Sequence, residues 1–159
     1  ILHAIDTLHN QRNDFMLNII HDLNNQEVEE YIQEHHLEDI IHLVGKKDES
    51  EVAKAIQKCD FMLQFSNYET QSCVLLESFC CGKPVLTTPV GGIAEIANPE
   101  NAIFTEPKNE TQLTEKLSYM LDHYQDLDAN AIRSQAIEFC STEIIGNNFR
   151  SLYQNILKK

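Results

Sequence analysis

Two carboxylates, Glu69 and Glu77, lie eight residues apart in a stretch that runs from a turn into a helix. The apolar run at 60–65 predicts a buried strand before them, and residues 72–81 predict an apolar helix that ends at Gly82. The first carboxylate falls in the turn, and the second falls about two helical turns further on. Open α/β sheets bind ligands at the carboxyl ends of their strands, and helix N-termini favour phosphate. This stretch is therefore the candidate binding site.

The composition is that of a globular protein: of the 159 residues, 42% are hydrophobic and 23% are charged. This length fits one domain with its own core. The apolar runs are far shorter than the roughly 20 residues that span a bilayer, and no secretion signal stands at the start. Residues Ile1–Ile5 resemble the middle of an amphipathic helix, so the sequence is expected to be a fragment of a longer protein.

The net charge of −13, from 12 Lys and Arg against 25 Asp and Glu, argues against nucleic-acid binding. Such binding requires cations that neutralise phosphates along an extended surface. A single small anionic ligand is still compatible with this charge, because backbone N–H groups can hold a phosphate. Local features of the fold must then offset the overall negative field.

The five cysteines are predicted to be reduced thiols of a cytoplasmic protein, packed as small apolar residues. Their number is odd, and no two of them form a C-x-x-C pair. A zinc site is therefore not expected, and no metal ligands are assigned. The cysteines are Cys59, Cys73, Cys80, Cys81 and Cys140.

Strand-like and helix-like patterns alternate along the chain. This alternation predicts an α/β, Rossmann-like domain with a parallel sheet flanked by helices. Asn25 and Ser50 are the predicted N-caps of two of the helices. The predicted strands lie at 15–20, 40–44, 60–65, 84–88 and 102–104, and the predicted helices at 1–11, 25–36, 50–58, 72–81, 92–97, 109–124, 128–140 and 143–158.

Several landmarks in order resemble the C-terminal domain of group 1 (family 4) retaining glycosyltransferases, which have the GT-B fold. They are Tyr68 followed by Glu69, the step to Glu77, the run 81–85 (Cys-Gly-Lys-Pro-Val), and the run 90–96 with its double glycine. The resemblance covers nearly the whole chain. It implies that residues 1–159 are the nucleotide-sugar domain, truncated at its first strand, and that the N-terminal acceptor domain is absent.

The resemblance assigns a role to each residue of the candidate site. Glu69 would contact the donor sugar at the catalytic centre, and Glu77 would bind the ribose hydroxyls. A carboxylate can accept hydrogen bonds from both hydroxyls of a ribose with charge-assisted strength. The apolar neighbours of Glu77 also predict a mostly buried helix, in which an unpaired charge would be costly. The other predicted contacts are the N–H groups of Gln71, Ser72 and Cys73 with the diphosphate, and the loop of Gly91 and Gly92.

The implied reaction moves a sugar from a UDP-, GDP- or ADP-type donor to a carbohydrate or lipid-linked acceptor, with retention. The leaving diphosphate requires positive potential, part of which a helix dipole supplies. In this family the remaining positive potential comes from an Arg and a Lys, which would precede Ile1. No metal cofactor is expected. The protein would act in polysaccharide biosynthesis in the cytoplasm, with membrane contact only through the absent domain.

The sequence also departs from the family pattern. Thr70 and Ser72 replace common glycines, and the residues at 21–24 replace a glycine-rich turn. These departures keep two alternatives open: a non-catalytic GT-B-like binding module, or a sugar-nucleotide epimerase.

Tyr68 either packs beside the donor or is a structural aromatic residue. In a sheet of order 3-2-1-4-5-6, loss of the central first strand makes the strands at 15–20 and 60–65 either pair directly or leave a gap.

Overall fold

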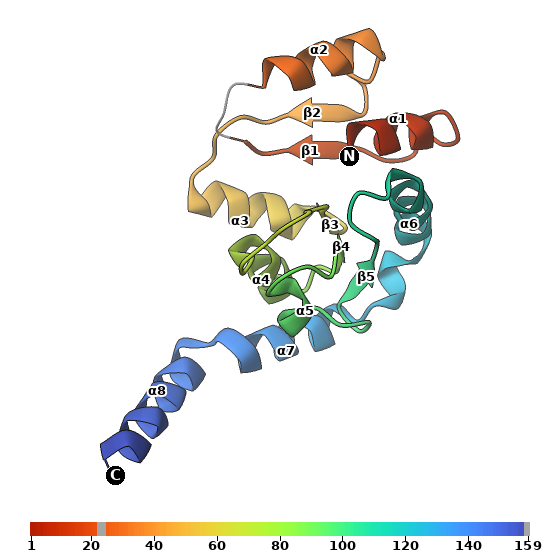
Figure 1. The fold of residues 1–159 in the computed structure, drawn as a ribbon. Coiled ribbons are helices and arrows are strands. Elements are labelled where there is room, and N and C mark those ends of the chain that lie inside the picture. The colour runs from red at the N-terminus through yellow and green to blue at the C-terminus, as the bar shows by residue number, and fades with distance from the viewer. Residues whose placement is uncertain (22–24, 158–159) are drawn as a thin grey trace.

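The computed structural model describes residues 1–21 and 25–157, and most of the turn predicted at 21–24 lies outside them. Parallel strands alternate with helices, which confirms the predicted α/β class (Figure 1). In chain order the elements are α1 (Leu2–His9), β1 (Leu17–Ile19), α2 (Gln26–Glu34), β2 (Ile41–Leu43), α3 (Glu49–Lys58), β3 (Met62–Gln64), α4 (Cys73–Cys80), β4 (Val85–Thr87), α5 (Ile93–Ile96), β5 (Ala102–Phe104), α6 (Glu110–His123), the short 3-10 helix η1 (Tyr124–Asp126), α7 (Ala129–Cys140) and α8 (Thr142–Leu157).

The described strands form two separate parallel sheets, β1–β2 and β3–β4–β5. In the first sheet Leu17 lies opposite Ile41, and in the second Met62 lies opposite Val85. Strand β4 pairs on both edges and is fully buried, whereas β1 and β3 each pair on one edge and are partly exposed. The sequence left open whether the strands predicted at 15–20 and 60–65 pair directly or leave a gap. The structure shows a gap between them, because β1 and β3 belong to different sheets.

The helix ends follow local capping chemistry, with one correction to the sequence prediction. Helix α3 is capped by Asp48 and not by Ser50, because Asp48 and Glu51 form a reciprocal capping box. Asn25 holds the N-cap position of α2 but makes no capping bond with its side chain. Helix α4 ends as predicted before Gly82, whose φ of +71° suits glycine.

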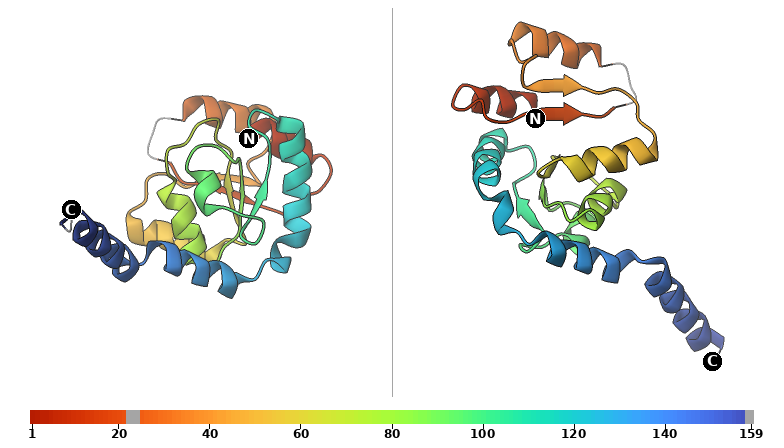
Figure 2. Two further views of the ribbon diagram at one scale, coloured as in Figure 1. Left: turned by 60° about the horizontal axis from the view of Figure 1, so that its bottom comes forward. Right: turned by 180° about the vertical axis from the view of Figure 1, so that it is seen from behind.

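A continuous apolar core connects the two sheets. Its buried residues include Ile41 of β2 and Leu86 of β4, with Ile5 of α1 and Met120 of α6 packed in the same cluster. Helices α1 and α6 lie side by side against this cluster (Figure 2). A second cluster packs α4 and α7 against the three-stranded sheet and includes Leu75, Phe79, Val85, Ile93 and Ile132.

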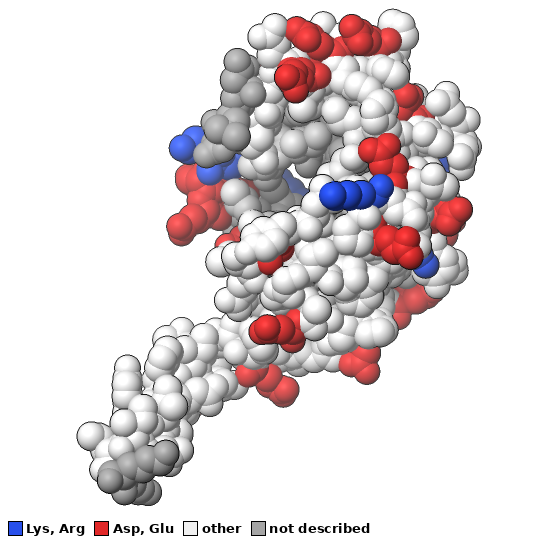
Figure 3. Space-filling model, in the orientation of Figure 1, with Lys and Arg blue, Asp and Glu red and all other residues white. Residues whose placement is uncertain are grey.

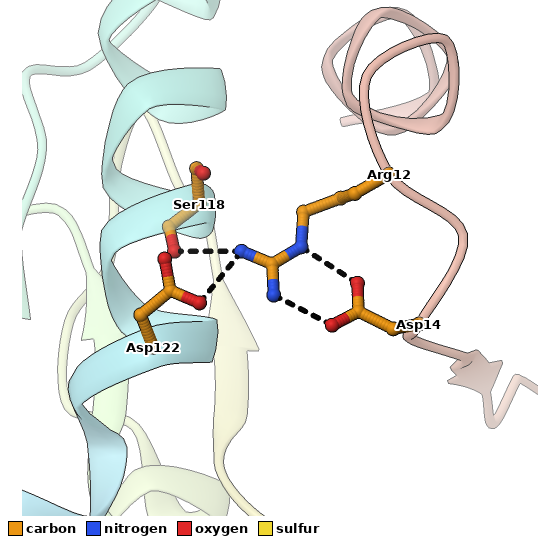
Figure 4. A network of polar contacts seen from close by, with 4 residues as sticks. All are labelled: Arg12, Asp14, Ser118 and Asp122. Atoms are coloured by element: carbon orange, nitrogen blue, oxygen red, sulfur yellow. Dashed lines mark hydrogen bonds and ion pairs between the residues drawn. The ribbon is translucent and has the colours of Figure 1, made fainter.

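An arginine joins the loop before β1 to helix α6 (Figure 4). The Arg12 guanidinium donates to both oxygens of Asp14 at 2.7 Å and to Asp122 at 2.8 Å. It lowers the pKa of Asp14 through the paired hydrogen bonds. A shallow surface hollow of about 610 Å³ borders these groups, together with Ser118. Because its charges already pair with one another, we assign this hollow a structural role.

Helix α8 projects from the body of the molecule (Figure 1). None of its residues is buried, and its surface in Figure 3 carries few charges. The apolar residues Ile145, Phe149, Leu152 and Ile156 follow one another at helical spacing and are 40–59% exposed. No helix among the described residues has the length and apolar character of a membrane span. The long exposed stripe is thus a surface without a partner in the described part of the chain.

All five cysteines are free thiols, as predicted, but they are less buried than expected. Cys73 is exposed at the start of α4, and the other four are partly buried. The Sγ atoms of Cys80 and Cys140 lie 3.7 Å apart where α4 meets α7. Burial and this contact raise the pKa of Cys80 to about 11, so its thiol stays protonated at neutral pH.

Candidate functional site

The Glu69 carboxylate is held at both of its oxygens. Oε1 accepts a hydrogen bond from the backbone N–H of Thr70 at 3.0 Å, and Oε2 accepts one from Nε2 of Gln64 at 3.0 Å. Gln64 is the last residue of β3, so Glu69 lies just beyond the carboxyl end of a parallel strand, as predicted. The Glu69 side chain is partly buried and accessible from solvent. It is therefore an oriented acid at a surface where open α/β sheets bind ligands.

Gln64 also connects this acid to the start of helix α4. Its Oε1 accepts a hydrogen bond from Ser72 Oγ at 2.8 Å, and the same hydroxyl accepts the N–H of Leu75 at 3.2 Å. Sequence reasoning missed Gln64. The available signal was a polar side chain inside an otherwise apolar run at 60–65, directly before the polar turn.

The N-terminus of α4 retains free donors. Ser72 is the N-cap residue; its hydroxyl takes the N–H of Leu75, and its carbonyl takes the N–H of Leu76. Among the described residues this leaves the N–H groups of Cys73 and Val74 without a protein acceptor. The predicted contact Gln71 lies exposed just before the cap, and Cys73 is the first helical residue. Free N–H groups and the helix dipole favour an anion here.

Glu77 lies on the exposed face of α4, which corrects the expectation of a mostly buried helix. The helix is amphipathic: Leu75, Ser78 and Phe79 are buried, whereas Val74 and Glu77 are exposed. A charge on this face meets water, so burial cost gives no reason for a ligand. What the structure does show is that the carboxylate is accessible, on the same exposed face as Val74 of the first helical turn.

Gly91 and Gly92 form a turn that packs directly on the Glu69–Thr70 backbone. The Gly92 N–H donates to the Thr70 carbonyl at 2.9 Å. A Cβ atom at Gly91 would lie 1.7 Å from the Glu69 carbonyl oxygen, and one at Gly92 would lie 2.2 Å from the Thr70 carbonyl oxygen. Only glycine permits this approach. The two glycines therefore support the loop that carries Glu69, whether or not they also contact a ligand.

Tyr68 is 81% exposed, which excludes the structural role that the sequence left open for it. Its ring lies next to Glu69 in the chain and is available to a ligand.

In Figure 3 acidic side chains are spread over the surface, with few Lys and Arg among them. Among the described residues, no group of three His, Cys, Asp or Glu side chains is placed to hold a metal ion.

The fold and the site are those of a parallel α/β domain with a candidate ligand site beyond a strand end. Comparison with known proteins identifies the family. The family model described as glycosyl transferases group 1 matches residues 1–138. The chain therefore belongs to the group 1 glycosyltransferases, which confirms the resemblance inferred from its motifs.

Individual relatives agree with this assignment. The chain is 29% identical to N-acetyl-alpha-D-glucosaminyl L-malate synthase of Bacillus anthracis over 127 residues, which cover 77% of the chain and 32% of that protein. It spans 23–32% of the length of the curated relatives it matches.

Solved structures show the same fold. A glycosyltransferase from Rickettsia africae matches 99% of the chain, with 44% of its own length covered, a TM-score of 0.86 and 22% identity. Anabaena HepE in complex with UDP matches 96% of the chain, with 44% of its own length covered, a TM-score of 0.81 and 20% identity. The predicted GT-B-type fold is thereby confirmed.

Proposed function

We propose that residues 1–159 are the donor-binding half of a retaining glycosyltransferase, the C-terminal domain of a GT-B enzyme. The acceptor domain and the first strand of the sheet would then lie outside this chain. One observation carries the proposal: the Glu69 carboxylate is fixed at both oxygens, and the same hydrogen-bond network reaches a helix N-terminus that has free N–H groups.

Each group then has a defined task. Glu69 accepts hydrogen bonds from the donor sugar and holds it in the reactive orientation. The α4 N-terminus, with the N–H groups of Gln71, Ser72 and Cys73 as the predicted contacts, receives the diphosphate as negative charge develops on it. Glu77, on the exposed face of α4, accepts the ribose hydroxyls. No residue of this chain is assigned as a protein nucleophile.

The donor is proposed to be a UDP-, GDP- or ADP-sugar, and the acceptor a carbohydrate or a lipid-linked sugar. UDP is the first nucleotide to test, because a solved structure with this fold contains it. The same proposal includes activity without a metal ion and a role in polysaccharide synthesis. It also includes a cytoplasmic location, with membrane contact through the acceptor domain. Addition of a chelator should leave the activity unchanged.

A non-catalytic binding module is the second candidate, and Thr70 favours it. The Thr70 N–H donates to the Glu69 carboxylate, so it is not free to donate to a phosphate. A sugar-nucleotide epimerase would require further acids or histidines from outside this chain. Both alternatives predict that no sugar is transferred to an acceptor.

The test uses the complete protein and the variant Glu69→Gln. Wild-type protein should bind UDP or another nucleoside diphosphate and transfer sugar from the matching donor. E69Q should lower kcat/KM for the donor about a hundredfold, because a misplaced sugar reacts slowly. The matched control is E115Q, which changes an exposed carboxylate on α6. Binding without transfer would indicate the binding module, and equal activity of E69Q and E115Q would remove Glu69 from the catalytic centre.

A further inference from the structure

We propose that Gln64 is a positioning residue that sets the Glu69 carboxylate relative to the N-terminus of α4; this inference rests on the proposed function. Gln64 stands at the end of β3 and contacts both groups at once. One amide thus connects the acid expected at the sugar with the cap of the helix expected at the diphosphate. Nothing in the sequence motifs assigns a role to this residue.

The chemistry of the partners determines the orientation of the amide. An ionised carboxylate only accepts hydrogen bonds, so the Gln64 group that faces Glu69 must be the NH₂ group. The Ser72 hydroxyl accepts the N–H of Leu75, so its proton is free to donate to the Gln64 carbonyl oxygen. A flipped amide would place oxygen against oxygen at Glu69. The network therefore has one arrangement that satisfies every member.

The network restricts the motion of the acid. Without the Gln64 donor, Glu69 would keep only the N–H of Thr70, its neighbour in the chain. A single local bond leaves the outer side-chain torsions free to rotate. The Ser72 hydroxyl would also lose its acceptor. Because misplacement of a reacting group by about 1 Å can lower a rate a hundredfold, Gln64 acts on donor turnover through Glu69.

The first experiment is a thermal-unfolding cycle on the complete protein. Q64E removes the donor and places a second carboxylate against Glu69, so the unfolding midpoint should fall. Adding E69Q to Q64E restores a donor–acceptor pair with the two roles exchanged, and Ser72 and Thr70 keep acceptors. The double variant should recover most of the midpoint lost in Q64E. Failure to recover would show that the two side chains are not coupled.

The second experiment measures donor kinetics of Q64M, in which an unbranched apolar side chain of similar length replaces the amide. We expect kcat to fall at least tenfold, with the KM for the acceptor unchanged. The double variant Q64E/E69Q should keep a kcat/KM for the donor about a hundredfold below wild type, as E69Q does, although its stability recovers, because position 69 no longer carries a charge. If Gln64 is merely structural, Q64M should lower the unfolding midpoint but leave kcat of the folded protein unchanged.

The outcomes separate this inference from the function on which it rests. If wild-type protein neither binds nor uses any nucleotide sugar, the proposed function fails, and the positioning role fails with it. If wild-type protein is active and Q64M keeps full kcat and KM, only the role of Gln64 is overturned. If Q64M loses kcat and the double variant recovers the unfolding midpoint, both the proposed function and the positioning role of Gln64 are supported.

Discussion

At the scale of single residues, the two acids of the candidate site differ in how firmly the structure places them. Glu69 has hydrogen-bond donors on both oxygens, whereas Glu77 stands on the exposed face of α4. This contrast matches their proposed tasks. An acid beside the reacting sugar needs a fixed orientation, while an acid that binds ribose hydroxyls needs mainly to be accessible.

Glu77→Gln should therefore affect donor binding more than the chemical step. Loss of a charge-assisted hydrogen bond weakens binding by roughly 1.5–3 kcal/mol, so the KM for the donor should rise at least tenfold. Because ribose contacts are equal in the ground state and the transition state, kcat should change little. Steady-state kinetics of the complete protein, with E115Q as control, measures both. A large drop in kcat at constant KM would contradict the ribose role.

The residue-scale predictions from sequence succeeded where a motif placed a residue and failed where they relied on burial. The position of Glu69 after a core strand followed from the order of elements. The expected burial of Glu77 was wrong, because Leu75 and Phe79 face the core while Glu77 lies on the opposite side of the same helix. Gln64 was missed because its role depends on a network across three segments, which no local pattern encodes.

At the scale of elements, the pattern of apolar residues predicted every strand and α-helix of the described chain, with ends displaced by a few residues, but not the 3-10 helix η1. Periodicity was sufficient for most elements because one side of each packs on a core, and α8 keeps the same apolar spacing although none of its residues is buried. The helix caps were less predictable. Asp48 and Ser50 are both good capping residues in one short stretch, and the reciprocal contact of Asp48 with Glu51 selects the first.

The two loops of the site should be coupled through their glycines. Gly91→Ala would force a Cβ atom against the Glu69 carbonyl and occupy a φ of +51°, so it should destabilise the protein by more than about 1 kcal/mol. Gly146→Ala is the matched control. Gly146 lies within α8 with open space around it, and alanine there should stabilise the helix by up to about 1 kcal/mol.

Chemical denaturation of both glycine variants measures these changes. Two-dimensional NMR of G91A should also show shifted signals for Glu69 and Thr70, whose backbone the glycine turn contacts. If G91A is as stable as G146A, the close packing of the two loops is not present in solution.

At the scale of the whole molecule, two surfaces lack partners in the described chain. One is the apolar stripe of α8, and the other is the pair of strand edges on β1 and β3. The sequence could not decide whether these strands pair, because their apolar residues suit either arrangement. The structure keeps them apart, although one core cluster includes residues from both sheets. A parallel strand placed between them would give the strand order that the family resemblance implies.

Hydrogen exchange tests this arrangement at single amides. The Leu17 N–H bonds to β2 and the Met62 N–H bonds towards β4, so the next amides, Asn18 and Leu63, point to the unpaired edges. In residues 1–159 alone, both should exchange much faster than Leu86 of the central strand β4. In a complete protein that supplies the first family strand, both should become protected. Slow exchange of Asn18 and Leu63 in residues 1–159 alone would mean that β1 and β3 pair directly, and the two-sheet arrangement would be wrong.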